Sequence, residues 1–378
     1  MKRLFDNNHC TTNTRLNGTS NPGNPPTGFC EADLLGQIIS DKVADIIVAI
    51  LQVAFTGICA FAGIITNTIN ITVFLNMGLH DAVNVSLFSL AIGDLLSLVC
   101  SLWESICFNT KMEDLGTPIV FSEIEYVTGC WPHVCFVRVT SYATAFITLE
   151  RCLCITVPLK IKSIITPKRT KVVMGFLFFF VAATSAPEFY VTQLGWKFYP
   201  ERNRTMLGIH FIDGREKFES VTLVMNNIVL QCVAFVSVVI CTVVLIIQLN
   251  RKAQWRQQST RGDAASSGKD KRVIKMISFI AVIFIVCELP SVVNVIAMAF
   301  NPQIHPSGIN YNMFYVIWSV VYVMESVNST VNIFVYFNMS SRYKAVFTQI
   351  FIRPADTRGS KLVKNVTEQC QLSGTQTS

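Results

Sequence analysis

Seven apolar stretches, separated by polar loops, run through this chain of 378 residues. Because an α-helix rises roughly 1.5 Å per residue, about 20 residues cross a hydrocarbon core of roughly 30 Å. A large soluble protein could also bury such helices, but soluble chains seldom combine 51% hydrophobic with only 15% charged residues. The sequence therefore predicts an all-α membrane protein, a seven-transmembrane helix bundle. The expected spans are residues 46–75, 83–107, 131–157, 172–190, 221–249, 273–300 and 313–337.

The distribution of charge predicts the orientation, because Lys and Arg collect on the cytoplasmic side of a membrane. With the N-terminus outside, the segments after the third, fifth and seventh spans lie inside, and these are rich in Lys and Arg. The outer segments hold more acidic than basic residues. We interpret the net charge of +7 as an orientation signal and not as a nucleic-acid-binding surface. The expected location is the plasma membrane, with the C-terminus in the cytoplasm.

The segments outside the spans predict four regions. Residues 1–45 are polar, lack the apolar core of a signal peptide and form an extracellular tail. Asn17 and Asn203 each begin an Asn-x-Thr glycosylation sequence in an outer segment. After the bundle of residues 46–337, residues 338–352 have an apolar face and a basic face, which predicts a short amphipathic eighth helix on the membrane surface. Residues 353–378 form a cytoplasmic tail.

The inner loop of residues 250–272 and the tail carry Ser and Thr among basic residues. Such segments are candidate docking surfaces for a cytoplasmic partner and targets for kinases, and a phosphorylated tail would suit an arrestin-type partner. An unmodified, solvated tail is the alternative.

Four cysteines lie at or beyond the outer surface, which allows three disulfide pairings. A bond between Cys107 and Cys130 would close the loop between the second and third spans and is slightly favoured. Cys10 and Cys30 would then form the second pair.

Polar side chains within the spans are candidates for function, because an ionisable group in hydrocarbon is costly. Asp94 stands in the middle of the second span, and three polar residues of the seventh span recur at spacings of three and four. Two interpretations remain open: a wet cavity that holds a small cation, or an interhelical hydrogen-bond network without an ion. The residues expected to converge are Asn67, Asp94, Thr140, Asn328, Ser329 and Asn332.

An acid and a base are adjacent at the inner end of the third span, Glu150 and Arg151. Neighbouring side chains on a helix diverge by about 100°, so Arg151 can reach across the floor of the bundle. Asp270, at the inner start of the sixth span, is the expected partner. We expect Arg151 to close the cytoplasmic end of the bundle while Glu150 and Asp270 hold it. Release of Arg151 would open a cleft for a cytoplasmic partner.

Short motifs occur in five of the spans. They are Asn67; Leu90-Ala91-x-x-Asp94; Glu150-Arg151-Cys152 with Pro158; Phe284-x-x-Cys287-Glu288-Leu289-Pro290; and Asn332-Ile333-Phe334-Val335-Tyr336. Together they resemble the rhodopsin-like (class A) family of G-protein-coupled receptors, and most closely its invertebrate neuropeptide and chemosensory orphan receptors. The resemblance implies that Arg151 is the switch residue, Asp94 the carboxylate of a sodium site, and Tyr336 a residue that swings inward on activation.

The chain also departs from this family. No cysteine occurs between Cys154 and Cys232, so the outer loop before the fifth span cannot form the disulfide bond to the third span that most relatives have. A Cys107–Cys130 bond could substitute. Glu288 replaces the expected aromatic toggle, and Ile333 replaces the expected proline.

The predicted ligand pocket contains an unusual ionisable set. Deep acids cannot stay charged in hydrocarbon without a partner, so we expect Arg138 to pair with Glu288 or Glu325 while His133 and the other acid face the ligand. A ligand with a basic group, such as an arginine side chain or an amidated peptide end, would suit the site. A purely structural ion pair is the alternative. The set is Glu104, His133, Arg138, Glu288 and Glu325.

These observations predict a receptor that binds an extracellular ligand, with a neuropeptide as the favoured class, and activates a heterotrimeric G protein. His133 stands where amine receptors carry an acid, and residues 313–337 hold no lysine for retinal, so biogenic amines and light are not expected stimuli. A receptor for small odorants and a ligand-capturing receptor with weak signalling are the alternatives. A transporter would show paired half-repeats, and an enzyme would show a nucleophile with a base, or metal ligands. The sequence shows neither pattern, so we expect neither a transporter nor an enzyme. No cofactor is expected beyond an allosteric sodium ion.

Overall fold

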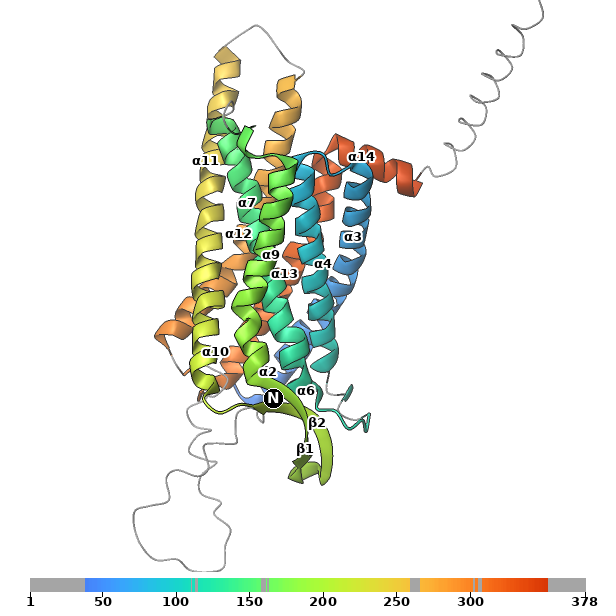
Figure 1. Cartoon of the computed structure of the whole chain (residues 1–378), viewed down its shortest axis with the longest axis vertical. Helices are drawn as coiled ribbons and strands as arrows, with labels where there is room; N and C mark the ends of the chain where they lie inside the picture. Colours follow the sequence, from blue (N-terminus) through green and yellow to red (C-terminus); the bar gives the residue numbers. More distant parts are fainter. Residues whose placement is uncertain are drawn as a thin grey trace, which may run out of the picture.

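Long helices stand side by side in the computed structural model of this chain and form a bundle (Figure 1). A two-stranded hairpin covers one end of the bundle and the short helix α14 crosses the other end, so we name these the hairpin end and the α14 end. The structure describes residues 38–109, 111–112, 115–157, 161, 163–258, 266–301, 303–304 and 308–352, except for the side chains of residues 201, 216, 252–258 and 266–271.

Three of the long helices contain a π-helical turn near the hairpin end. A π-turn holds one residue more than an α-turn and widens the helix locally, and it often occurs at functional sites. The first helix consists of α2 (Asp41–Val48), η2 (Ala49–Phe55) and α3 (Thr56–Met77). The third consists of α6 (Phe121–Glu125), η3 (Tyr126–Cys130) and α7 (Trp131–Thr156). The fifth consists of α10 (Arg215–Leu223), η5 (Val224–Leu230) and α11 (Gln231–Gln258).

The remaining helices follow the expected order. They are α4 (Ala82–Cys107), α9 (Pro167–Val191), α12 (Ser266–Phe300), α13 (Tyr311–Met339) and α14 (Ser341–Phe347), which continues as η6 (Thr348–Ile352). The side chain of Ser340 caps α14 by accepting a hydrogen bond from the backbone N–H of Tyr343 (3.2 Å).

A β-hairpin connects α9 to α10. Strand β1 (Thr192–Tyr199) pairs antiparallel with β2 (Arg204–Phe211) across the short helix η4 (Pro200–Arg202). The exposed Asn203 adopts a left-handed conformation (φ 47°) that closes the turn, and Asn tolerates this region better than most residues. The strands add regular structure to a segment in which the sequence indicated only a loop.

Six of the described helices are long and apolar enough to cross a membrane. The helix of α7 is not among them, because it carries ionisable residues such as His133 and Arg138 that lower its hydropathy. Both side chains are buried inside the bundle, where α7 packs against α4, α9, α11 and α12. Large apolar side chains such as Phe61, Phe176 and Phe179 are exposed on the outer surface of the bundle, as expected for contacts with lipid.

The largest apolar core lies at the α14 end. Phe74, Leu87, Ile147, Ile277 and Tyr336 are buried there against one another and their neighbours, and they come from five different helices. This core ties α14 to the bundle and surrounds the region in which the switch residues were predicted.

Several helix ends differ from the expected spans. The third helix begins at Phe121, ten residues before the expected start at Trp131, because its first turns extend beyond the hydrocarbon. Helix α11 continues to Gln258 and α12 already begins at Ser266, so much of the expected inner loop 250–272 is helical. Residues such as Gln, Lys and Arg have good helix propensity, which explains this extension. Residues 1–37 and 353–378 lie outside the described part of the chain.

Candidate functional site

A buried polar network surrounds Asp94 on α4. The Asp94 carboxylate accepts hydrogen bonds from the Ser329 hydroxyl (3.0 Å) and from the Asn332 amide (2.8 Å), both on α13. The Asn67 amide of α3 donates to the backbone carbonyl of Ser329 (2.8 Å). The structure thus brings together four of the six predicted residues from three helices and forms the hydrogen-bond network that was one of the two interpretations.

The other two predicted members lie differently. The Thr140 hydroxyl donates to the carbonyl of Val137 in its own helix (2.8 Å), and its methyl group faces Gly93. Asn328 is buried without a recorded hydrogen bond to Asp94. No group of three or more His, Cys, Asp and Glu side chains suited to a metal occurs among the described residues. A sodium ion at Asp94 therefore stays a prediction.

The network extends to α14 through residues that were not singled out in the sequence. Asn70 donates to the amide oxygen of Asn67 (3.2 Å), and the Tyr343 hydroxyl donates to the amide oxygen of Asn70 (2.7 Å). A chain of polar contacts consequently connects Asp94 in the middle of the bundle to the surface helix α14.

Two of the predicted switch residues, Arg151 and Tyr336, lie at a cavity of about 600 Å³ at the α14 end. Arg151 pairs with Glu150 (2.5 Å between Nη2 and Oε1) and lines this cavity together with Tyr336. Tyr336 is already inside the bundle, where its ring contacts Phe74 and Tyr343 at centroid distances of 5.2 and 5.5 Å. The side chain of Asp270 lies outside the described residues, so the third member of the predicted switch stays a prediction.

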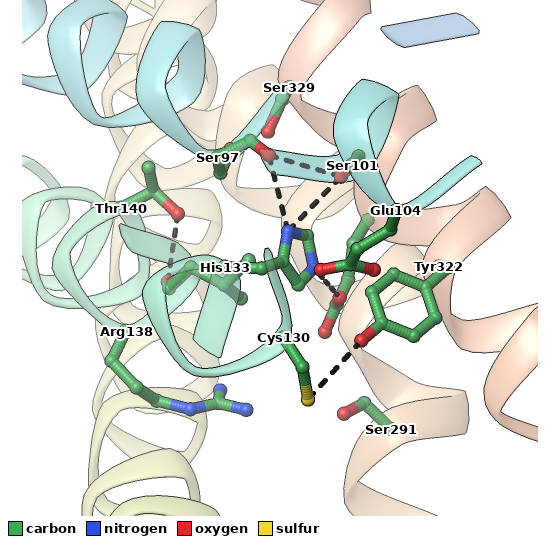
Figure 2. Close-up of polar contacts among 12 residues, drawn as sticks. Ser97, Ser101, Glu104, Cys130, His133, Arg138, Thr140, Ser291, Tyr322 and Ser329 are labelled. Atoms are coloured by element: carbon green, nitrogen blue, oxygen red, sulfur yellow. Dashed lines mark hydrogen bonds and ion pairs between the residues drawn. The ribbon is translucent and has the colours of Figure 1, made fainter. Parts of the chain in front are cut away.

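A buried cluster of charges lies between the Asp94 network and the hairpin end. His133 Nε2 pairs with Glu325 Oε2 (3.0 Å), and His133 Nδ1 contacts the Ser101 hydroxyl (3.1 Å) and the Ser97 carbonyl (3.2 Å). Figure 2 shows the imidazole beside Ser97, Ser101 and Tyr322, and the ring centroids of His133 and Tyr322 are 4.8 Å apart. His133 is therefore held by the protein itself.

The second buried pair joins Arg138 on α7 to Glu288 on α12, with 3.8 Å between Nη1 and Oε2. The Gln231 amide donates to Glu288 Oε2 (3.4 Å) and to the Ser291 hydroxyl (2.6 Å). The structure therefore places Arg138 beside one of its two predicted partners and His133 beside the other. Glu104 is fully buried and accepts a hydrogen bond from Gln52 of η2 (3.4 Å).

A cavity of about 300 Å³ opens above this cluster at the hairpin end. None of the five predicted pocket residues lines it; they lie one layer deeper. Two of the π-helical turns, η3 and η5, contribute to its wall. The lining residues are Phe108, Ser122, Glu125, Tyr126, Cys130, Trp131, Val134, Glu219, Leu223, Val224, Asn227, Ile228, Val295, Met298, Ala299, Phe314, Tyr315, Trp318 and Tyr322.

The acids of this cavity, Glu125 and Glu219, were missed in the sequence. Glu125 is 5% exposed and precedes η3, and Glu219 accepts a hydrogen bond from the Tyr126 hydroxyl (3.5 Å). Both stand just outside the apolar stretches that defined the spans. The signal that could have found them is an acid within one or two turns of a span, since helices commonly extend past the hydrocarbon.

The predicted disulfide bond is not formed. Cys107 and Cys130 are free thiols, and Cys130 Sγ accepts a hydrogen bond from the Tyr322 hydroxyl on α13 (3.9 Å) (Figure 2). Cys130 is the last residue of η3 and lines the hairpin-end cavity, where its thiol contacts Tyr322 and not Cys107. Cys10, Cys30 and the glycosylation sequence at Asn17 lie outside the described residues.

Glu123 of α6 holds the hairpin over the bundle instead. Its carboxylate pairs with Lys197 (2.8 Å) and accepts hydrogen bonds from the Tyr199 hydroxyl (2.7 Å) and the backbone N–H of Ile209 (2.9 Å). Burial, and then the hydrogen bond and charge of Glu123, raise the pKa of Tyr199, so its phenol remains a donor. We call Glu123, Lys197, Tyr199 and Ile209 the hairpin clamp.

Comparisons with known proteins agree with this architecture. The family described as serpentine type 7TM GPCR chemoreceptor Srw matches residues 53–354 of the chain. A curated protein named Allatostatin-A receptor, from Bombyx mori, is 23% identical over 346 residues, which cover 88% of this chain and 85% of that protein. Both similarities extend over the helices that carry the two cavities and the polar network.

Proposed function

We propose that this chain, which belongs to the serpentine seven-transmembrane G-protein-coupled chemoreceptor family Srw, binds a neuropeptide in its hairpin-end cavity and activates a heterotrimeric G protein at its α14 end. As a member of this family, it is a multi-pass membrane receptor that couples an extracellular ligand to a G protein. The observation that carries the proposal is the pair of cavities at opposite ends of one bundle, both lined in part by the third and seventh helices.

The hairpin end is proposed to face the outside of the plasma membrane, with the N-terminus on the same side. The glycosylation sequence at Asn203 lies at the exposed tip of the hairpin, and the basic residues of the predicted inner segments lie at the α14 end. Positive charge favours the cytoplasmic side. Kinases and an arrestin-type partner would act on the cytoplasmic side, at residues 353–378.

Two features support a peptide ligand. The protein named Allatostatin-A receptor is similar over most of its length, which favours a neuropeptide. The hairpin is a wide surface beside the cavity, and a peptide longer than the cavity could contact both. A small odorant is the second candidate, because the family is described as chemoreceptors and a volume of about 300 Å³ is at the lower end for drug-sized ligands.

Arg151 is the residue on which G-protein activation is expected to depend. It lines the α14-end cavity and is only partly buried, so a partner that enters the cavity can reach its guanidinium group. An arginine released from Glu150 would offer charge-assisted hydrogen bonds to a carbonyl or carboxylate of that partner.

The test measures agonist-dependent nucleotide exchange on added G protein, with cells that express the chain first screened against amidated peptides and small odorants. Arg151→Ala should abolish exchange while agonist binding and surface expression persist. Lys171→Ala is the matched control, because Lys171 is an exposed base on α9 at the same end of the bundle as Arg151. This variant is expected to leave exchange unchanged. Agonist binding without exchange in the wild-type protein would contradict the proposal and identify a ligand-capturing receptor.

A further inference from the structure

The buried carboxylates near the hairpin-end cavity outnumber the buried bases. Glu104, Glu125 and Glu325 lie close enough together for their charges to interact. Glu288, in the layer below, interacts with Glu325 as well as with Arg138. Each of these four acids is at most 6% exposed.

In the described part of the chain, the buried bases that face these acids are Arg138 and His133. Arg138 is paired with Glu288, and His133 is paired with Glu325. These pairings leave Glu104 and Glu125 without a basic partner of their own among the described side chains. Burial and mutual repulsion disfavour the charged forms of these acids, so a cation that enters the site would stabilise those charged forms.

Glu125 is the acid of this group that a ligand can reach, because it lines the cavity. Aromatic rings line the same cavity around it. A cation between aromatic faces and a carboxylate gains cation–π attraction in addition to its ion pair. The rings are those of Phe108, Tyr126, Trp131, Phe314, Tyr315, Trp318 and Tyr322.

Two unpaired polar atoms in the cavity wall indicate which second group of the ligand would lie beside its positive charge. The amide oxygen of Asn227, a residue that is 9% exposed, has no hydrogen-bond partner among the described residues, and neither does the indole nitrogen of Trp318. The first is an acceptor and the second a donor, and buried polar atoms are normally paired. An amide group, which has an N–H and a carbonyl, can pair with both.

A free carboxylate on the ligand would be repelled. No lysine or arginine lines the cavity among the described residues, and Glu125 and Glu219 both do. A ligand carboxylate would add a negative charge to a site that already has an excess of them, and like charges at short range are strongly unfavourable.

We infer that the hairpin-end cavity binds the end of a peptide that carries a guanidinium or ammonium group next to an uncharged amide, with Glu125 as the counter-ion of that cation. This inference rests on the proposed function, since it names the part of the ligand that the receptor recognises. A volume of about 300 Å³ suits a short peptide end and not a whole peptide.

The test uses three small probes with the purified full-length receptor: phenylalanyl-arginine amide, its uncharged citrulline analogue, and phenylalanyl-arginine with a free carboxylate. A lysine version of the first separates guanidinium from ammonium. Binding is measured from the rise of the unfolding temperature with probe concentration, because a ligand of the folded state stabilises it. The arginine amide should bind more tightly than both the citrulline amide and the free acid.

The Glu125→Gln variant should bind the arginine amide roughly thirtyfold more weakly, which corresponds to about 2 kcal/mol for the loss of one partner of a buried charge pair. It should also lose the preference for arginine over citrulline, and Glu125→Asp should restore part of it. Asp213→Asn removes an exposed acid near the same end and should change the affinity less than about twofold, because exposed charges are screened. The unliganded unfolding temperature of each variant shows whether it folds.

Several results would overturn the inference. The first is that the arginine probes fail to stabilise the wild-type receptor at millimolar concentration. The second is that the arginine amide and the citrulline amide bind equally well. The third is that Glu125→Gln binds the arginine amide as tightly as the wild-type receptor does. If an uncharged agonist drives exchange that depends on Arg151 while the arginine probes do not bind, the receptor function stands and the cation site is wrong. If the probes bind through Glu125 and no agonist drives exchange, the site stands and the proposed signalling is wrong.

Discussion

Replacing Glu123 should release the hairpin from the bundle. The Glu123 carboxylate is 5% exposed and accepts contacts from Lys197, Tyr199 and the backbone of Ile209, all at 2.7 to 2.9 Å. Without it, the described ties that remain include the backbone hydrogen bond from Val120, just before α6, to Leu207 (3.0 Å) and the ring contact between Tyr126 and Phe211 (6.2 Å between centroids). The hairpin is then expected to open more often.

The magnitude follows from the three contacts. A hydrogen bond to a charged group contributes roughly 1.5 to 3 kcal/mol, but the three contacts share one carboxylate and are not additive. The Lys197 side chain is also 28% exposed, which reduces its share through screening. We therefore expect Glu123→Ala to lower the free energy of hairpin opening by about 3 kcal/mol, a factor of about one hundred. Glu123→Gln keeps an acceptor oxygen and should cost about 1 kcal/mol.

Hydrogen exchange of backbone amides in β1 and β2 measures this opening directly, because exchange from a locally open state reports the local free energy. The Glu123→Ala variant should exchange these amides about one hundredfold faster, while amides in the core of α4 stay unchanged. The double variant with Lys197→Met should be less destabilised than the sum of the single variants, since both remove one interaction.

Asp213→Asn is the control for a general change of charge at this end, because Asp213 is exposed and lies beyond β2. It should leave exchange of the hairpin unchanged. A change of less than about twofold in the Glu123→Ala variant would show that the other contacts hold the hairpin without the carboxylate, and the reasoning from the carboxylate would be refuted.

Three further outcomes are expected. Tyr343→Phe removes the hydrogen bond from α14 to α3 and should destabilise the receptor by about 1 to 2 kcal/mol in thermal unfolding. If Asp94 holds sodium, sodium chloride should stabilise the wild-type protein relative to choline chloride, by about 1.4 kcal/mol at ten times the dissociation constant, and Asp94→Asn should lose this gain. Gly63→Ala would place a methyl group 2.7 Å from Leu98 and should cost about 1 to 3 kcal/mol, whereas Gly175→Ala, which meets no neighbouring atom, should not destabilise.

The fold was predictable because spans depend on local composition. The apolar stretches and the motifs around Asn67, Asp94, Arg151 and Asn332 predict the helices and their family, and the family match over residues 53–354 confirms the seven-transmembrane fold and the receptor class. Span lengths were less predictable, since hydropathy marks where hydrocarbon ends and not where a helix ends. The first and third helices begin earlier for this reason.

The hairpin and the π-turns were not predictable from the pattern. The hairpin lies over the bundle through contacts between residues distant in sequence, such as Lys197 with Glu123 across 74 positions, which no local pattern indicates. A π-turn inserts one residue and leaves the apolar composition unchanged, so the sequence of a span with a π-turn cannot be told from that of a span without one. The charged residues within the spans predicted a ligand pocket around them, and that pocket stays a prediction. The cavity at the hairpin end is lined instead by acids at the edges of the spans, Glu125 and Glu219.

The π-turns of the first, third and fifth helices also bear on how ligand preference can change over evolution. Because a π-turn holds one residue more than an α-turn, removing one residue from η3 or η5 would turn it into an α-turn and keep the flanking helix in register. The side chains at the turn would change, while the portion near α14 kept its packing. A single-codon deletion there could therefore alter the wall of the hairpin-end cavity and leave the α14 end intact.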